Sequence, residues 1–279
     1  MPLVNMKTFL QLLEEKNLIA PAFNTTNLEM TLSIVQGAEE LGYPVIVQIA
    51  PTNVKLSGYD YIANIVKTAA DKVNIPVTLH LDHGMTFEDI KKAVDAGFNS
   101  VMIDASKLPY EENISFTREV VEYCHERGVS VEAELGELGG KEDDHESDES
   151  AQTDPKLARE FVERTGIDLL AVSVGNIHGL DGQPQINLEL LREIADTVDI
   201  PLVIHGGSGI PDDILAQLKN YNVRKINLAS DLRRRFISSV GQRYEQNPNE
   251  YNLISVLLEA QSNVKEVVID KFSTLNRYA

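Results

Sequence analysis

Three histidines stand at or just beyond the carboxyl ends of apolar segments typical of buried strands: His83, His178 and His205. The carboxyl ends of the strands of a barrel meet at one mouth, so side chains that are distant in sequence converge there. Three imidazoles with an open fourth position form the ligand set expected of a catalytic zinc ion. Asp104 and Glu134 occupy similar strand-end positions and are alternative ligands or partners of the ligands. The histidine spacing matches no compact metal motif, so this prediction rests on position alone.

The stretch VTLHLDHG (77–84) places an acid directly before one of these histidines. A carboxylate beside a metal ligand can act as general acid or base on a bound substrate. We therefore expect His83 to hold the metal and Asp82 to handle a proton. His80 lies two residues earlier, on the same pleat face as Asp82, and we interpret it as structural or as a partner of a ligand.

Glycines and a serine follow the seventh predicted strand in the segment HGGSGIPDD (205–213). Backbone N–H groups in such a turn, just before a helix, form a cradle for an anion. The eighth strand ends in NLASD (227–231), which supplies Asn227, Ser230 and a second helix start. Phosphate bound after the seventh and eighth strands is a recurrent barrel arrangement. The position favours a phosphate site, although GGSG alone is equally compatible with an ordinary glycine-rich turn.

These side chains require a scaffold that brings eight strand ends together. Apolar runs bounded by Gly, Pro and Asn alternate with amphipathic helical stretches along the chain. The predicted strands are residues 18–24, 44–50, 76–83, 100–106, 130–135, 169–175, 201–207 and 225–230. Eight such units in 279 residues predict a (β/α)8 TIM barrel. The alternative, a doubly wound sheet with a dinucleotide site, would need a G-x-G-x-x-G segment after the first strand, and none occurs.

We predict a single domain over residues 1–279, with two departures from the regular repeat. The segment 136–155, GELGGKEDDHESDESAQTDP, is long, acidic and glycine-bearing, and loops of this length are usually lids or disordered. The tail from residue 250 predicts extra C-terminal helices, one or two in number. These helices could cover a barrel end or a partner subunit.

Composition excludes several classes of protein. A net charge of −18 argues against sequence-independent binding of nucleic acid, which needs basic surface. No apolar run reaches about 18 residues and no N-terminal targeting pattern occurs, so we expect a soluble, cytoplasmic protein without membrane contacts. The one cysteine, Cys124, excludes an internal disulfide framework and lies in a helical pattern as inert core filler. His125, in that pattern, and His145, in the acidic segment, are interpreted as surface residues.

Several segments together resemble the class II, zinc-dependent aldolases that form dihydroxyacetone phosphate, a family that includes fructose- and tagatose-bisphosphate aldolases. The segments are PAFNTTNLE, HLDHG, SVMIDAS, VSVEAELGELGGKEDD, GNIHG, LVIHGGSGIP and KINLASDLR, and they cover essentially the whole chain. The resemblance implies a TIM barrel, assembled as a homodimer or homotetramer, that reversibly cleaves a phosphorylated ketose. It also implies one zinc ion per subunit, held by His83, His178 and His205, with Asp104 and Glu134 as acidic neighbours.

The resemblance further assigns the proton-transfer and phosphate-binding residues. Asp82 matches the acid/base that handles the proton on the C4 hydroxyl. Glu142 matches the mobile-loop glutamate that moves the proton on the dihydroxyacetone-phosphate carbon. The cradle for the C1 phosphate is matched by Gly179, Gly207, Ser208, Asn227 and Ser230. A monovalent cation near this phosphate site is also implied.

The sequence departs from the bisphosphate aldolases at the distal end of the substrate. Those enzymes hold the C6 phosphate with an Asn after the first strand, a Ser that ends the second strand, and an Arg from the C-terminal region of a neighbouring subunit. Asn24 keeps the first position, but the other two are Ala50 and Ile254, and residues 247–254 contain no basic residue. Position 229 is Ala, as in the tagatose-type enzymes.

These losses indicate a ketose 1-phosphate whose distal group is not phosphate. We expect a sulfonate, as in 6-deoxy-6-sulfofructose 1-phosphate from sulfoquinovose breakdown, which would yield dihydroxyacetone phosphate and sulfolactaldehyde. The alternative is fructose or tagatose 1,6-bisphosphate held by different residues. Candidates for the distal contacts are Asn24, Gln48, Ala50, Thr52, Asn53 and Lys55.

Three other functions are less compatible with the sequence. An aldolase that forms a Schiff base needs a desolvated lysine at a strand end, whereas Lys107 follows the fourth strand and Lys225 stands at the wrong end of the eighth. A barrel that has lost catalysis and serves as a binding subunit is opposed by the complete set of Asp82, Glu142 and three histidines. A metal-dependent hydrolase would carry H-x-H after the first strand, which APAFNTTN lacks.

Overall fold

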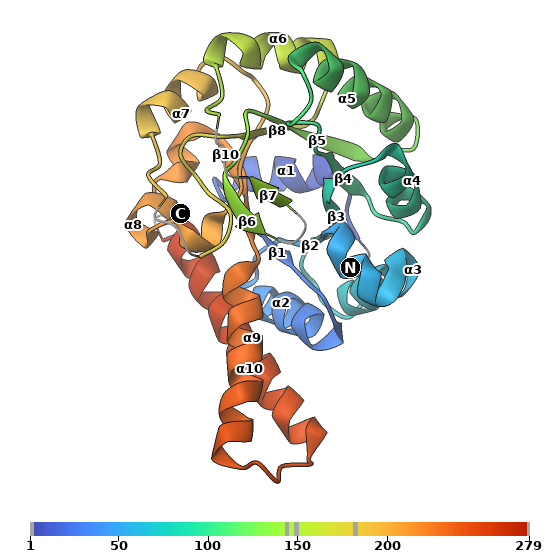
Figure 1. The fold of residues 1–279 in the computed structure, drawn as a ribbon, viewed down its shortest axis with the longest axis vertical. Coiled ribbons are helices and arrows are strands. Elements are labelled where there is room, and N and C mark those ends of the chain that lie inside the picture. Colours follow the sequence, from blue (N-terminus) through green and yellow to red (C-terminus); the bar gives the residue numbers. More distant parts are fainter. Residues whose placement is uncertain (1–2, 143–144, 148–150, 181–183, 278–279) are drawn as a thin grey trace.

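Eight parallel strands close into a barrel in the order β1-β10-β9-β8-β5-β4-β3-β2 (Figure 1). The computed structural model describes residues 3–142, 145–147, 151–180 and 184–277, with only the backbone for 141, 142 and 145–147. The strands are β1 (Ala20–Asn24), β2 (Val45–Ile49), β3 (Val77–Gly84), β4 (Ser100–Ile103), β5 (Ser130–Leu135), β8 (Leu169–Val172), β9 (Leu202–Ile204) and β10 (Val223–Leu228). Each strand overlaps its predicted segment, so the predicted TIM barrel is confirmed.

Helices surround the barrel and bury their apolar faces against the outward-facing strand residues (Figure 1). They are α2 (Leu28–Leu41), α3 (Pro51–Ala70), α4 (Phe87–Asp95), α5 (Tyr110–His125), α6 (Pro155–Thr165), α7 (Leu188–Ala195) and α8 (Asp212–Leu215), with 3-10 turns η1 (Gly207–Gly209) and η2 (Leu218–Tyr221). Side-chain caps begin several of them: Asn27, Thr86, Asp154 and Asn187 each accept a bond from a first-turn N–H group. In the described part of the chain, none of the helices is both long enough and apolar enough to cross a membrane.

One end of the barrel is closed by a helix that the sequence analysis did not single out, α1 (Met6–Glu15). Its side chains Met6, Phe9 and Leu13 are fully buried. They form a second apolar cluster with barrel residues Ala20, Ala22, Ile46, Leu169, Ala171 and Val203, together with Leu18. The barrel interior is therefore an apolar core at this end, which leaves its polar side chains for the opposite mouth.

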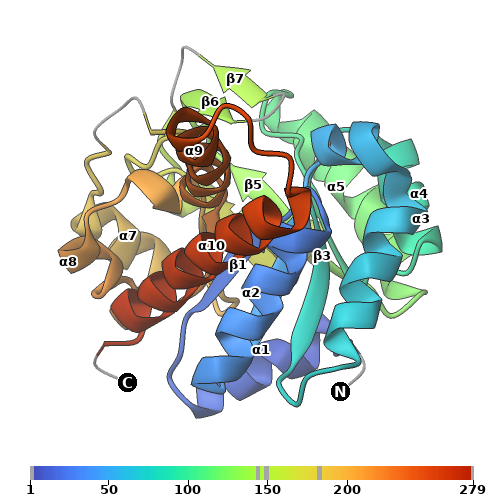
Figure 2. The same ribbon diagram turned by 90° about the horizontal axis from the view of Figure 1, so that it is seen from below.

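The acidic segment 136–155 contains a small antiparallel sheet of β6 (Gly140–Glu142) and β7 (His145–Ser147). Figures 1 and 2 place this hairpin at the barrel end opposite α1. Glu137 pairs with Ala151 at the base of the hairpin, and Gly140 forms a bridge with His178. The segment thus lies over the mouth, where a lid was predicted, and its described parts form a hairpin.

The tail from residue 250 forms one extra C-terminal helix, α10 (Leu253–Leu275), as predicted, and it follows α9 (Ser230–Gln246), the helix after β10. The two helices form an arm that projects from the barrel, and α10 then returns along α2 (Figures 1 and 2). The hydroxyl of Ser33 donates to the Gln261 carbonyl at 2.8 Å and ties α2 to α10. We call residues 237–258 of α9, the connection and α10 the arm.

Candidate active site

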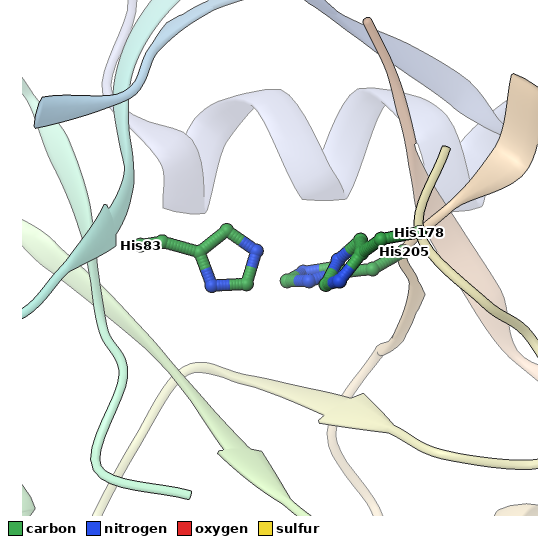
Figure 3. A group of neighbouring side chains, drawn as sticks. All are labelled: His83, His178 and His205. Atoms are coloured by element: carbon green, nitrogen blue, oxygen red, sulfur yellow. The ribbon is translucent and has the colours of Figure 1, made fainter. Parts of the chain in front are cut away.

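Three histidines from separate segments converge at the barrel mouth (Figure 3). His83 ends β3, His178 lies in the loop after β8, and His205 follows β9. Ring nitrogens of the three residues lie within 4.8 Å of one another. The centroid of the His83 ring is 4.7 Å from that of His205 and 5.3 Å from that of His178. Tertiary structure therefore assembles the three imidazoles that the sequence predicted would meet.

An unusual backbone conformation aims His83 into this group. Successive residues of a regular strand point to opposite faces, so Asp82 and His83 would point apart. His83 instead has φ of +48°, and the β3–β4 register shifts between Leu81 and Gly84. The Nε2 atom of His83 then lies 3.9 Å from Oδ1 of Asp82. A left-handed non-glycine residue costs about 1–3 kcal/mol and is typical of functional sites.

The loops that carry His178 and His205 are fastened to each other. Asn176 donates from Nδ2 to the His205 carbonyl at 3.1 Å and accepts at Oδ1 from the Val174 N–H at 2.9 Å. Gly206 has φ of +66°, and a Cβ there would collide with the carbonyl of Ile177. Only glycine fits this close approach, which keeps the two histidines side by side.

Two acidic side chains complete the group. Oδ2 of Asp104 is 2.8 Å from Nδ1 of His83, and Oε2 of Glu134 is 3.7 Å from Nδ1 of His205. Both oxygens of Glu134 and Nδ1 of His205 are buried and have no hydrogen-bond partner among the described residues. Buried polar atoms are normally paired, and a divalent cation among these nitrogens and oxygens would pair them. The donor set of imidazole and carboxylate suits zinc.

The charges of these groups follow from burial and from one another. Burial raises the pKa of Glu134 well above its usual value, and the nearby Asp104 carboxylate adds to the effect. Burial lowers the pKa of His205 well below its usual value, and positive charge at His83 adds to this. Burial also opposes protonation of His83, but the carboxylates of Asp82 and Asp104 prevail and raise its pKa to about 10.

Asp82 is 4% exposed and accepts hydrogen bonds from three amide side chains. Its Oδ2 accepts from Asn24 Nδ2 at 2.8 Å and Gln48 Nε2 at 3.2 Å, and its Oδ1 accepts from Asn227 Nδ2 at 2.9 Å. Burial alone would raise the pKa of Asp82, but positive charge at His83 and Lys225, together with the hydrogen bond from Asn24, outweighs burial and lowers it. The side chain is therefore an ionised acceptor beside the three imidazoles.

A buried ion pair lies beneath these groups, and its role was not predicted. Lys225 and Glu132 are both fully buried, and Nζ of Lys225 is 2.9 Å from Oε2 of Glu132. The backbone of Lys225 stands early in β10, as predicted, but its side chain reaches Asn227 in the polar layer, at 2.6 Å. The sequence did contain an indication of this role. Lys225 is two residues from Asn227 and therefore shares its strand face, and Glu132 is related to Glu134 in the same way.

His80, His125 and Cys124 lie where the sequence indicated, whereas the His145 side chain is outside the described part of the structure. His80 is fully buried, its Nδ1 is 2.8 Å from Ser100 Oγ, and its Nε2 is 3.6 Å from Oε2 of Glu132. His125 lies on α5 and pairs with Asp168 at 2.9 Å. Cys124 is buried in the core, and burial raises the pKa of its thiol to about 12, so it is an inert thiol.

The residues predicted to bind a phosphate lie in three neighbouring segments. Gly207 and Ser208 lie in η1, and a Cβ at Gly207 would collide with Ile226 of β10. The first helical residue of α9 is Ser230, and Ser208 Oγ accepts from the Asp231 N–H at 3.4 Å. A Cβ at Gly209 would lie 3.4 Å from the Gly179 carbonyl, which places the loop after β8 against η1. Backbone N–H groups and the start of a helix thus meet beside Asn227.

The candidates for the distal end of the substrate divide between two environments. Asn24 and Gln48 hold Asp82, as described above. Ala50 precedes α3, where Asn53 accepts from the Ala50 N–H at 3.1 Å and donates to Thr26 Oγ1 at 3.1 Å. The hydroxyl of Thr52 is buried without a hydrogen-bond partner among the described atoms. Lys55 and, on the arm, Ile254 are exposed.

Glu142, the candidate for the second proton-transfer residue, lies in β6 opposite His145. The side chains of both residues are outside the described part of the structure. Lys107, an unlikely Schiff-base lysine by sequence, is exposed in the loop after β4.

The similarity of this chain to known proteins agrees with the geometry of the site. A family model described as class-II fructose-bisphosphate aldolase matches residues 4–278. A fructose-bisphosphate aldolase of Staphylococcus epidermidis is 40% identical over 284 residues and covers 99% of both chains. One from Geobacillus stearothermophilus is 41% identical over 275 residues and covers 97% of this chain and 96% of its own.

Solved structures agree with this assignment. The YdjI aldolase of Escherichia coli K12 superposes with a TM-score of 0.86 at 32% identity, over 98% of this chain and 97% of its own. A putative fructose-1,6-biphosphate aldolase of Coccidioides immitis superposes with a TM-score of 0.88 at 29% identity, over 97% and 96%. With the histidine cluster and the barrel, these matches show that the chain belongs to the class II fructose-bisphosphate aldolase family and is an aldehyde-lyase.

Proposed function

We propose that the protein reversibly cleaves a ketose 1-phosphate to dihydroxyacetone phosphate and an aldehyde, with one zinc ion per subunit. The convergence of three histidine nitrogens within 4.8 Å, beside the buried carboxylate Asp82, supports this proposal. His83, His178 and His205 would hold the zinc ion, and Glu134 and Asp104 would be alternative ligands or partners. Bound there, the ion supplies a Lewis acid for the negative charge that develops when the C–C bond breaks.

Asp82 is the proposed acid/base for the C4 hydroxyl of the ketose. In the cleavage direction it would accept the hydroxyl proton, and in the condensation direction it would return it. Its ionised state and its three amide donors suit the accepting role. Glu142, on the hairpin over the mouth, is proposed for the proton on the dihydroxyacetone-phosphate carbon.

The C1 phosphate is proposed to bind between the loop after β8, η1 and the start of α9. Gly179, Gly207, Ser208, Asn227 and Ser230 would line that site. The positive end of the dipole of a 17-residue helix and the backbone N–H groups of the tight glycine turn favour an anion here, which offsets the overall charge of −18. A monovalent cation beside the phosphate is part of the same proposal.

Two substrates differ at the distal group. The names of the relatives favour fructose 1,6-bisphosphate, and the tagatose epimer remains an equivalent choice because the C4 configuration is not specified by these residues. A sulfonate, as in 6-deoxy-6-sulfofructose 1-phosphate, is favoured by Ala50 at the end of β2 and by the absence of a basic residue from 247–254. Arg243, the nearest arginine before that stretch, is paired with Glu250 at 3.0 Å.

The three candidate sugars can be distinguished by measuring kcat/KM for the cleavage of each by the zinc-loaded enzyme. A preference for the sulfonate supports the second choice, and a clear preference for either bisphosphate refutes it. Loss of activity with a chelator and its return with zinc would exclude a barrel that has lost catalysis. No cleavage of any ketose phosphate would instead favour a binding subunit. A cytoplasmic location is proposed with this activity.

A further inference from the structure

A single lysine connects the proton-transfer side of the site with the metal side. Lys225 and its partner Glu132 are fully buried inside the barrel. Nζ of Lys225 lies 2.9 Å from Oε2 and 3.2 Å from Oε1 of Glu132, and it donates to Oδ1 of Asn227 at 2.6 Å. Asn227 and Glu132 in turn contact Asp82 and His205.

The first connection determines which way the Asn227 amide faces. An ammonium group has only donors, so it can bind Asn227 only through Oδ1. That leaves the Nδ2 group to face Asp82, whose Oδ1 accepts at 2.9 Å. With the amide reversed, an oxygen would face the carboxylate and Asp82 would lose a donor. Lys225 thus selects the one orientation in which Asn227 supports an ionised Asp82.

The second connection determines which nitrogen of His205 carries the proton. Oε1 of Glu132 lies 2.9 Å from Nε2 of His205. A carboxylate that is paired with Lys225 accepts hydrogen bonds and does not donate, so Nε2 must carry the hydrogen. The lone pair is then on Nδ1, which lies 3.7 Å from Oε2 of Glu134 and has no hydrogen-bond partner in the described part of the chain. A carboxylate behind a ligating histidine selects its tautomer in this way.

We propose that Lys225 is a positioning residue that orients Asn227 toward Asp82 directly and fixes the metal-binding tautomer of His205 through Glu132. Lys225 touches neither substrate nor metal in this role. The part of the proposal that concerns metal binding rests on the proposed function, whereas the tautomer of His205 and the orientation of Asn227 do not.

The first test compares Lys225→Met with Lys219→Met. Lys219 is also buried, at 7% exposure, but it lies in η2 and its Nζ has no hydrogen-bond partner among the described residues. Zinc affinity is measured by chelator competition, and turnover is measured after full loading with zinc. We expect Lys225→Met to weaken zinc binding about 10–100-fold and to lower kcat of the loaded enzyme. Lys219→Met should leave both unchanged.

A measurement on the metal-free protein distinguishes the proposed positioning role of Lys225 from a purely structural role. The ¹⁵N shifts of the imidazole nitrogens in the metal-free protein report the tautomer, and the signal of His205 is identified by its loss in His205→Asn. We expect the Nε2–H form in the wild type and a mixture of tautomers in Lys225→Met. This measurement remains valid if the wild type binds no zinc or cleaves no sugar, so the proposed function and this inference can fail separately.

A double variant covers the case in which the single variant does not fold. Lys225→Met/Glu132→Gln removes both buried charges, and the glutamine oxygen can still accept from Nε2 of His205. We expect the His205 tautomer and zinc affinity to return while kcat stays low, because Asn227 is no longer oriented. Wild-type zinc affinity and tautomer in Lys225→Met, or wild-type kcat in the double variant, would overturn the inference.

Discussion

Asp82 is held by three amide groups from three different strands, β1, β2 and β10. Each amide donates, so together they favour the carboxylate over the acid and hold it beside His83. The same contacts explain why Asn24 and Gln48 are fully buried although both are polar. The proposed acid/base and the nearest proposed metal ligand are therefore adjacent in sequence but are held by different partners.

This separation leads to a prediction for two neighbouring substitutions. Asp82→Asn should retain zinc and lose about 10²–10⁴ in kcat, because the isosteric amide keeps the packing but cannot accept a substrate proton. His83→Ala should lose most of the zinc. Bound metal is measured by atomic absorption and turnover by release of dihydroxyacetone phosphate. Near-normal turnover in Asp82→Asn would refute its assignment as the acid/base.

The release of protons when zinc binds provides a second prediction, which concerns His83 and His205. In the metal-free protein the pKa of His83 is raised to about 10, whereas burial lowers that of His205 below its usual value. Below pH 10, zinc must therefore displace a proton from His83, and apparent zinc affinity should rise with pH up to that value.

Calorimetry in buffers of different ionisation enthalpy counts the protons released. At pH 8 we expect about one from His83, and a second if Glu134, whose pKa burial raises, ionises as well. No proton release would contradict the assignment of His83 as a ligand, and His83→Asn should abolish the first proton.

The hairpin of β6 and β7 is attached directly to the loop of a proposed ligand. The N–H of His178 donates to the Gly139 carbonyl at 3.0 Å, and Gly140 forms a bridge with His178. Gly140 has φ of +99°, and a Cβ there would collide with the His178 carbonyl. The hairpin therefore holds the backbone of a proposed metal ligand in addition to covering the mouth.

Gly140→Ala tests this attachment. We expect zinc affinity to fall on the order of 10-fold, because the new methyl group must push the His178 backbone away. Gly128→Ala is the matched control: it has φ of +70° but no atom within 4 Å of the added Cβ, so it carries only the cost of a left-handed alanine, about 1–2 kcal/mol. Zinc affinity is measured by chelator competition and stability by thermal unfolding. Equal zinc affinity in the two variants would show that the hairpin does not position His178.

The arm gives the whole molecule an extended apolar surface. Tyr251 is 93% exposed, Ile254 73% and Leu253 65%, all near the turn between α9 and α10. Exposed apolar side chains that cluster in this way mark interaction surfaces. We therefore keep the prediction of a homodimer or homotetramer and place the arm in its interface.

Light scattering of an arm variant tests this prediction. We expect the wild type to be an oligomer and Leu253→Glu/Ile254→Glu to shift it toward the monomer, because two charges cannot be buried in an apolar contact. Asn249→Glu adds charge at the same turn without removing apolar surface and should leave the mass unchanged. A monomeric wild type would contradict the prediction.

Much of the fold could be predicted because local patterns specify it. Each strand alternates with an amphipathic helix, and eight repeats leave a barrel as the simplest closed arrangement. Helix α1 was missed because it precedes the first repeat, and only its packing into the barrel gives it a role. The sequence did indicate a special loop at 136–155, but the pairing of Gly140 with His178 connects segments that no local pattern relates.

The barrel, the polar residues at the strand ends and, through the motifs, the class II aldolase family could all be predicted from the amino-acid sequence. This was possible because parallel strands bring all their carboxyl ends to one mouth. The way in which those residues are held became visible only in the folded chain, in the left-handed turn that aims His83 and in the Lys225–Glu132 pair between Asn227 and His205. The Lys225–Glu132 network depends on contacts across the barrel between residues 73–145 positions apart, and hydrogen-bond geometry over such separations is set by packing and not by local spacing.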